Sequence, residues 1–209
     1  MVRGLLLDLD DTLYDRGAAF RAWTDEVAHT QLGRALELQE LESLIAIDRR
    51  GHRPRAALAA EALALHGLRV DPDEFPFQLA AHIVPEPAVR ETIAALARKL
   101  RIAIVTNGGA AQRTKLARIG LDRTVHAVFV SGELGFTKPD RRIFECALAW
   151  TELDAVDVVF VGDEPVIDLA PAAALGMATA WRARAEWPLE LAPPTYRISC
   201  ISELTEICA

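Results

Sequence analysis

Short apolar runs typical of β-strands alternate with segments that have helical periodicity, and this alternation restricts the fold more than any other feature of the sequence. The runs cover residues 2–7, 102–105, 125–130, 158–161 and 177–181. Between runs, apolar residues recur at spacings of three and four, as in the segment that begins at Pro87. Strands that alternate with helices usually form a parallel sheet covered on both faces. We therefore predict an α/β fold built on a parallel sheet.

The segment between the first and second apolar runs is too long for a simple crossover. A crossover needs about a dozen residues, whereas this one extends from Asp11 to Arg101. Within it, residues 18–32, 36–47 and 55–65 are rich in Ala, Leu, Glu and Arg, which predicts helices. Residues 71–87 contain four prolines, which predicts a stiff linker. We therefore predict a core of residues 1–14 and 86–209, with a helical cap inserted at residues 15–85.

Charge and cysteine content exclude several classes of protein. The chain has 23 Lys and Arg residues against 30 Asp and Glu residues, and this net charge of −7 argues against a nucleic-acid binder. No apolar stretch approaches the roughly 20 residues that a membrane span needs. The three cysteines, Cys146, Cys200 and Cys208, lack a paired close spacing, so we expect reduced, buried thiols in a cytoplasmic protein. Neither a membrane nor a nucleic acid is an expected partner.

Polar residues follow four of the predicted strands. The carboxyl ends of the strands are where open α/β sheets bind ligands, so these residues are expected to share one crevice. An Asp after a strand is also common in ordinary turns, so no single strand end assigns a function. In chain order, the residues at these ends are Asp8, Asp10, Thr106, Asn107, Lys138, Gly162, Asp163 and Asp168.

Taken together, the four motifs resemble those of the haloacid dehalogenase superfamily of phosphohydrolases. In chain order, the motifs are Asp-x-Asp-x-Thr, a Thr that ends a strand, a Lys before a helix, and Gly-Asp followed by a second Asp. The first is matched by Asp8, Asp10 and Thr12, the second by Thr106, the third by Lys138, and the fourth by Gly162, Asp163 and Asp168. The resemblance implies a Rossmann-like core with an α-helical cap between the first and second motifs. Three positions depart from the common pattern: Asp11 and Pro171 stand where Gly is frequent, and Arg141 stands where Pro is frequent. Since a proline inside a helix loses a backbone hydrogen bond, we predict that the helix around Pro171 starts late or kinks there.

The resemblance also implies a role for each residue in the hydrolysis of a phosphate monoester. Asp8 would attack phosphorus and form an aspartyl-phosphate. Asp10 would protonate the departing alkoxide and then accept a proton from the attacking water. The Thr106 hydroxyl and the Asn107 backbone would hold phosphoryl oxygens, while Lys138 would neutralise charge and restrain Asp8.

Charge counting in this crevice predicts a metal ion. Two carboxylates about 4 Å apart repel by about 4 kcal/mol at an effective dielectric constant of 20. One lysine cannot balance several such groups, and the chain offers no His or Cys cluster, so an oxygen-only site suited to Mg²⁺ is expected. By the resemblance, Asp8 and Asp163 bind the ion through carboxylates and Asp10 through its backbone carbonyl, with Thr12 and Asp168 in support.

The residue type at position 10 favours phosphoryl transfer over dehalogenation. By the resemblance, dehalogenases lack an acid at this place, since a halide leaving group needs no proton. We therefore predict a Mg²⁺-dependent phosphatase that acts on a small phosphorylated metabolite. Tyr14 and Arg16 follow the first motif and are placed to contact the leaving group. Two alternatives are a phosphomutase of the same superfamily and a non-enzymatic, receiver-like phosphoacceptor or scaffold; the first-strand Asp8 and the long insert disfavour the receiver.

Overall fold

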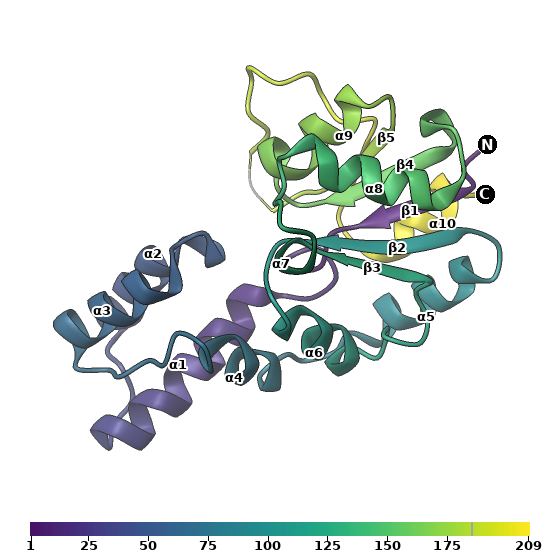
Figure 1. Cartoon of the computed structure of the whole chain (residues 1–209). Coiled ribbons are helices and arrows are strands. Elements are labelled where there is room, and N and C mark those ends of the chain that lie inside the picture. Colours follow the sequence, from purple (N-terminus) through teal and green to yellow (C-terminus); the bar gives the residue numbers. More distant parts are fainter. Residues whose placement is uncertain (185) are drawn as a thin grey trace. The chain divides into compact units, whose positions relative to one another are not determined.

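A six-stranded parallel sheet forms the core of the computed structural model, which describes residues 1–184 and 186–209. The strand order is β3-β2-β1-β4-β5-β6, so the first strand of the chain lies inside the sheet (Figure 1). This arrangement confirms the predicted α/β fold with a parallel sheet. The strands are β1 Gly4–Leu7, β2 Arg101–Thr106, β3 Ala127–Val130, β4 Val158–Gly162, β5 Ala178–Arg182 and β6 Tyr196–Ile198. The strand β6 is not among the predicted strands, because its three residues form no continuous apolar run.

The register of the sheet brings the ends of β1, β2 and β4 to one edge. Leu6 of β1 is paired with Ala103 of β2 on one side and with Phe160 of β4 on the other. All four residues of β1 are buried, which explains why this strand is apolar throughout rather than alternating. The chain segments that leave β1, β2 and β4 therefore begin next to one another.

Helices cover both faces of the sheet. Figure 1 shows α5 (Pro87–Ala97) and α6 (Ala111–Arg118) on one face, with α8 (Arg141–Thr151) and α9 (Ala170–Ala174) on the other. The α8 helix begins at Arg141, and the Asp140 side chain caps it by accepting a hydrogen bond from the Arg142 amide at 2.9 Å. The short elements of this unit are α7 Ser131–Leu134, η2 Ala155–Asp157, η3 Pro165–Leu169, η4 Ile201–Glu203 and α10 Leu204–Ile207.

The segment around Pro171 confirms the prediction of a late helix start. A single π-helical turn, η3, comes first, and the regular helix α9 begins at Ala170. Pro171 lies in the first turn of α9, where its missing N–H costs no intrahelical hydrogen bond.

The chain divides into two compact units, Met1–Tyr14 with Pro85–Ala209, and Asp15–Val84. The second unit contains α1 (Arg16–Leu32), α2 (Leu38–Asp48), η1 (Arg49–Gly51), α3 (Arg55–His66) and α4 (Phe75–Ala81). Its core includes Trp23, whose ring contacts Phe20 and Phe75 at centroid distances of 5.6 and 4.6 Å. The predicted stiff linker is wrong in part, because α4 lies within it: Pro76 occupies the first turn, the one place where a helix accepts proline without loss.

A buried ion pair joins two helices of the second unit. The Arg16 guanidinium contacts the Asp48 carboxylate at 2.5 and 2.9 Å, and both side chains are almost inaccessible to solvent. Asp48 also accepts a hydrogen bond from the Gly51 amide at 3.0 Å. Arg16 is thus engaged in an ion pair inside this unit.

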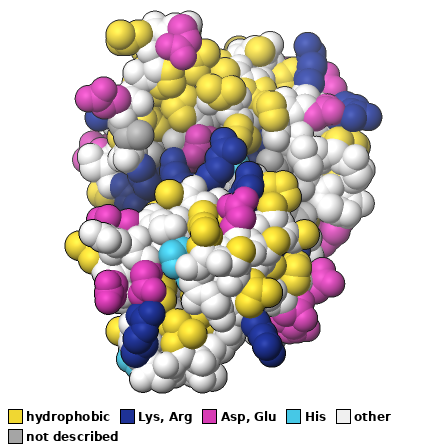
Figure 2. Space-filling view, turned by 90° about the vertical axis from the view of Figure 1, so that its left-hand side faces the viewer, with side chains coloured by type: hydrophobic (Ala, Val, Ile, Leu, Met, Phe, Trp, Pro, Cys, Tyr) yellow, Lys and Arg dark blue, Asp and Glu magenta, His cyan; other side chains and the backbone are white. Residues whose placement is uncertain are grey.

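The surface differs from expectation at the cysteines. Cys146 and Cys200 are exposed and Cys208 is half-buried, with none of the three in a disulfide. The expectation of buried thiols is therefore wrong for two of them. On the face shown in Figure 2, apolar side chains are interspersed with side chains of both charges. Among the described residues, the helices are too short or too polar for any of them to cross a bilayer.

Candidate active site

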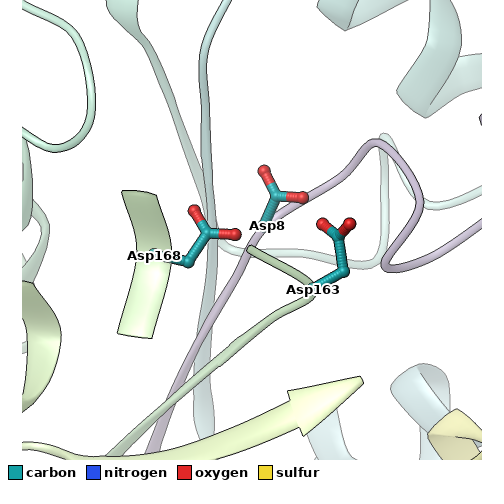
Figure 3. Close-up of side chains that lie close together, drawn as sticks. All are labelled: Asp8, Asp163 and Asp168. Atoms are coloured by element: carbon teal, nitrogen blue, oxygen red, sulfur yellow. The ribbon is translucent and has the colours of Figure 1, made fainter. Parts of the chain in front are cut away.

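Three buried aspartates converge at the carboxyl end of the sheet. Asp8 directly follows β1, Asp163 directly follows β4, and Asp168 lies in η3. One carboxylate oxygen from each lies within 4.8 Å of the other two (Figure 3). Their residues are only 6, 5 and 1% exposed, so the three negative charges share a site that is nearly closed to water.

Gly162 creates the space for one of these carboxylates. A Cβ atom at this position would lie 2.6 Å from Oδ2 of Asp168 and 2.7 Å from its Cβ, which is closer than real atoms approach. The π-helical turn η3 returns the chain so that Asp168 packs against the end of β4, and its Oδ2 accepts a hydrogen bond from the Glu164 amide at 3.2 Å. The Gly-Asp pair of the fourth motif is therefore a steric requirement as well as a chemical one.

Lys138 bridges two of the aspartates. Its Nζ lies 2.6 Å from Oδ1 of Asp8 and 2.7 Å from Oδ1 of Asp168. The Asn107 side chain fixes the backbone around this lysine: its Nδ2 donates to the Lys138 carbonyl at 2.9 Å, and its Oδ1 accepts from the Lys138 amide at 2.8 Å. The sequence assigned Asn107 to the site through its backbone, and the structure shows in addition that its side chain joins the second and third motifs.

Thr12 contributes a hydroxyl to the same cluster. Its Oγ1 donates to Oδ2 of Asp8 at 3.0 Å and lies 3.3 Å from Oδ1 of Asp163. The turn between Asp8 and Thr12 passes through Asp11, whose φ of 57° lies in the left-handed region. Aspartate tolerates this conformation better than most residues, which explains how Asp11 can replace the glycine that is frequent there.

Burial and like charges raise the pKa of Asp8. In the metal-free site its pKa rises from 3.8 to about 7, chiefly because burial disfavours the charged form; Lys138 lowers it, while Asp168 and Asp10 raise it further. Burial lowers the pKa of Lys138, but Asp168 and Asp8 outweigh that effect, so the pKa of this lysine lies above its usual range. The cluster is therefore short of positive charge even with the lysine in place.

Asp10 lies in a second group of contacts that sequence reasoning missed. Oδ1 of Asp10 accepts hydrogen bonds from Lys115 Nζ at 2.6 Å and from the Tyr14 hydroxyl, and Oδ2 accepts from Gln112 Nε2 at 2.6 Å. The Gln112 amide nitrogen also lies 2.6 Å from Oγ1 of Thr106. Gln112 and Lys115 are three positions apart on α6, so they share one face of a helix that leaves the second motif; this spacing is the signal that could have identified them.

The residues present fit a divalent cation. The site contains four carboxylates and two ammonium groups, those of Asp8, Asp10, Asp163 and Asp168 and those of Lys115 and Lys138. Their charges leave a net charge of −2, which one divalent cation neutralises. All donors in the buried group are oxygen atoms, as hard cations such as Mg²⁺ prefer. The close group contains Asp168 as well as the predicted Asp8 and Asp163, while the Asp10 carboxylate is paired with Lys115.

Tryptophan and glycine residues outside the predicted site support its backbone. Trp181 of β5 donates a hydrogen bond from Nε1 to the Asp163 carbonyl at 3.0 Å. Beside β2, the Gly132 amide donates to the Gly108 carbonyl at 2.9 Å, and a Cβ at position 132 would come within 2.7 Å of that oxygen. The structure thus brings the predicted residues of all four motifs to one edge of the sheet.

Comparison with known proteins agrees with this geometry. The family model described as haloacid dehalogenase-like hydrolase matches residues 2–176. The pyrimidine 5'-nucleotidase YjjG of Escherichia coli (strain K12) is 31% identical over 148 residues, which cover 67% of this chain and 65% of that protein. A glyceraldehyde 3-phosphate phosphatase of Methanopyrus kandleri is 28% identical over 203 residues, covering 86% of this chain and 83% of the relative. Among solved structures, the magnesium-bound HAD-hydrolase YfnB from Bacillus subtilis superposes with a TM-score of 0.80 at 23% identity, covering 99% of this chain and 98% of the other.

Proposed function

This chain belongs to the haloacid dehalogenase-like hydrolases, and from that premise we propose that it is a Mg²⁺-dependent phosphatase that hydrolyses a small phosphorylated metabolite. The observation that carries the proposal is the buried group of Asp8, Asp163 and Asp168 with Lys138 between two of its members. The names of the curated relatives, a 5'-nucleotidase and a glyceraldehyde 3-phosphate phosphatase, support phosphate ester chemistry.

In this proposal Asp8 is the nucleophile. One of its carboxylate oxygens attacks phosphorus, the bond to the ester oxygen breaks, and an aspartyl-phosphate forms. Lys138, 2.6 Å from Oδ1, holds the carboxylate in place, and the Thr12 hydroxyl, 3.0 Å from Oδ2, fixes its rotation about the Cβ–Cγ bond. Water then attacks the phosphorus of this intermediate, which releases phosphate and regenerates Asp8.

Asp10 is the proposed acid and base. It gives its proton to the departing alkoxide oxygen in the first step and takes a proton from the attacking water in the second. Its side chain is 24% exposed, unlike that of Asp8 at 8%, so the two carboxylates two positions apart have different access to solvent. A dehalogenase would have no use for this acid, since a halide leaves without a proton.

The remaining site residues neutralise and orient the phosphoryl group. Thr106 ends β2 and offers its hydroxyl to a phosphoryl oxygen, and the backbone at Asn107 offers a second contact. Asp8 and Asp163 would hold the metal through carboxylates and Asp10 through its carbonyl, with Asp168 and Thr12 in support. When bound, Mg²⁺ supplies positive charge to the phosphoryl oxygens as negative charge builds up on them. The helical unit of residues 15–84 is the proposed cap that selects the leaving group.

Turnover of p-nitrophenyl phosphate with Mg²⁺ tests this function. We expect repeated release of phosphate by the wild-type chain and a loss of at least about 10³-fold in kcat for Asp8→Asn, because the amide cannot act as nucleophile. Asp122→Asn, the same change at an exposed loop position, is the matched control and should keep wild-type activity. At most one phosphoryl transfer per chain would overturn the proposal in favour of a receiver-like phosphoacceptor.

A panel of phosphorylated sugars, nucleotides and organic acids identifies the substrate class. Phosphate released in proportion to substrate consumed supports a phosphatase, whereas isomerisation of a sugar phosphate without phosphate release would identify a phosphomutase. The same panel measured with Asp8→Asn shows whether each activity depends on the proposed nucleophile.

A further inference from the structure

We propose that Lys115 and Gln112 of α6 are positioning residues that aim the Asp10 carboxylate at the leaving-group oxygen. This inference rests on the proposed function, because it concerns the acid and base of that reaction. It concerns a pair of residues outside the four motifs, on a helix that follows the second one.

The contacts restrain both oxygens of Asp10. Lys115 Nζ lies 2.6 Å from Oδ1, and Gln112 Nε2 lies 2.6 Å from Oδ2, so rotation of the carboxylate in either direction breaks a hydrogen bond. Lys115 and Gln112 are themselves buried, at 5 and 3% exposure. Tyr14, also buried, donates its hydroxyl to Oδ1 as well. These buried donors leave part of the Asp10 side chain accessible, which is what an acid that must reach a substrate requires.

Gln112 also couples the acid to the predicted phosphate-binding hydroxyl. Its Nε2 lies 2.6 Å from Oγ1 of Thr106 as well as 2.6 Å from Oδ2 of Asp10. A single amide group therefore sets the distance between the group that would hold a phosphoryl oxygen and the group that would protonate the ester oxygen. Proton transfer requires a donor within about 3 Å of its target, and a misplacement of about 1 Å can cost about 100-fold in rate.

The turn after β2 is shaped around the Gln112 side chain. Gly108 has a φ of 144°, and a Cβ atom at this position would lie 2.8 Å from Cγ and 2.9 Å from Cδ of Gln112. The Ser131 side chain holds the same turn from the other side, because its Oγ accepts a hydrogen bond from the Gly108 amide at 3.0 Å. Gln112 thus occupies a place that only glycine at position 108 leaves open.

A leaving-group experiment separates positioning of the acid from a general structural role. Phenyl phosphate and p-nitrophenyl phosphate have nearly the same shape, but phenoxide is a much poorer leaving group and depends more on protonation. The parameter to measure is kcat/KM, because it reports the steps up to release of the phenol and excludes hydrolysis of the phosphoenzyme. The enzyme is the full chain with Mg²⁺, in the wild type and in Lys115→Met, which keeps the length of the side chain but removes its charge.

We expect Lys115→Met to lower kcat/KM about 100-fold for phenyl phosphate and less than about 10-fold for p-nitrophenyl phosphate, within the range that general acid catalysis contributes. Asp10→Asn should show the same selective loss, only larger. Lys99→Met, the same substitution at an exposed position of the core unit, should leave both values unchanged. An equal loss with both substrates would overturn the inference, because a misplaced acid affects the poorer leaving group more.

Gln112→Met provides a second test that removes no charge and preserves the bulk of the side chain. We expect this variant to lower kcat/KM for phenyl phosphate about 10-fold more than kcat/KM for p-nitrophenyl phosphate, as Lys115→Met does. An unchanged ratio of the two values would contradict the role of Gln112. This variant also keeps the inference testable if Lys115→Met does not fold, because removal of one amide donor perturbs the core less than removal of a buried ammonium group. A wild-type chain that turns over neither substrate would refute the proposed function itself, whereas turnover with an equal loss in the variants would refute only the positioning role.

Discussion

Replacing Asp8 with asparagine is expected to remove a pH-dependent loss of stability from the metal-free protein. In the folded chain the pKa of Asp8 is raised from 3.8 to about 7, mainly by burial, with Asp168 adding to the rise and Lys138 opposing it. As the pH rises between these two values, the unfolded chain releases the proton while the folded chain retains it. The unfolded state then binds fewer protons than the folded state, so the free energy of unfolding falls with increasing pH.

The size of this effect follows from the pKa values. The rise from 3.8 to about 7 corresponds to at most about 4 kcal/mol, since each pKa unit is worth about 1.4 kcal/mol. This contribution to stability is present below about pH 4 and is lost once the pH exceeds about 7. An asparagine side chain does not titrate, so the Asp8→Asn variant should gain stability relative to the wild type by up to about 4 kcal/mol across this range.

Urea unfolding in the presence of EDTA, measured from about pH 4 to about pH 8, provides the assay. The quantity to follow is the difference in the free energy of unfolding between Asp8→Asn and the wild type. For Asp122→Asn, the control variant, the difference from the wild type should stay constant. Added Mg²⁺ should reverse the order above pH 7, because the ion binds the folded carboxylates and not the unfolded chain. Unfolding curves that shift in parallel for Asp8→Asn and wild type would refute the assignment of the raised pKa to Asp8.

Three further changes test other parts of the structure. Gly162→Ala places a Cβ atom 2.6 Å from Asp168 Oδ2 and should displace that carboxylate, so calorimetry is expected to show Mg²⁺ binding weakened by about 10-fold or more; unchanged affinity would argue against Asp168 as a supporting group. Arg16→Met leaves Asp48 buried without its cation and should lower the free energy of unfolding by about 3–5 kcal/mol in urea titrations, whereas a loss under about 1 kcal/mol would show that the pair contributes little. EDTA should abolish phosphate release and Mg²⁺ should restore it, and full activity in excess chelator would exclude a metal-dependent mechanism.

The sequence alone determined those features that depend on short stretches of the chain, such as the strands and the polar residues at their ends. An apolar run such as that before Asp8 can bury all of its side chains only inside a parallel sheet that is covered on both faces. The polar residues that follow such runs then lie at the carboxyl edge of the sheet. For this reason the fold class and the meeting of Asp8, Lys138 and Asp163 could be predicted from the sequence. The late helix start at Pro171 followed equally from a local rule, because a proline has no N–H to donate inside a helix.

Other features needed the tertiary structure, since they depend on how elements far apart in the chain are rotated toward one another. Lys115 is 105 positions from Asp10, and only the packing of α6 against the sheet turns it and Gln112 toward that carboxylate. The placement of Asp168 beside Lys138 depends likewise on the turn η3 and on the space above Gly162, neither of which has a periodic signal. Apolar periodicity records which face of an element is buried, but a buried polar side chain obtains its partner from whichever element is folded against it, and that choice is made only when the whole chain is assembled.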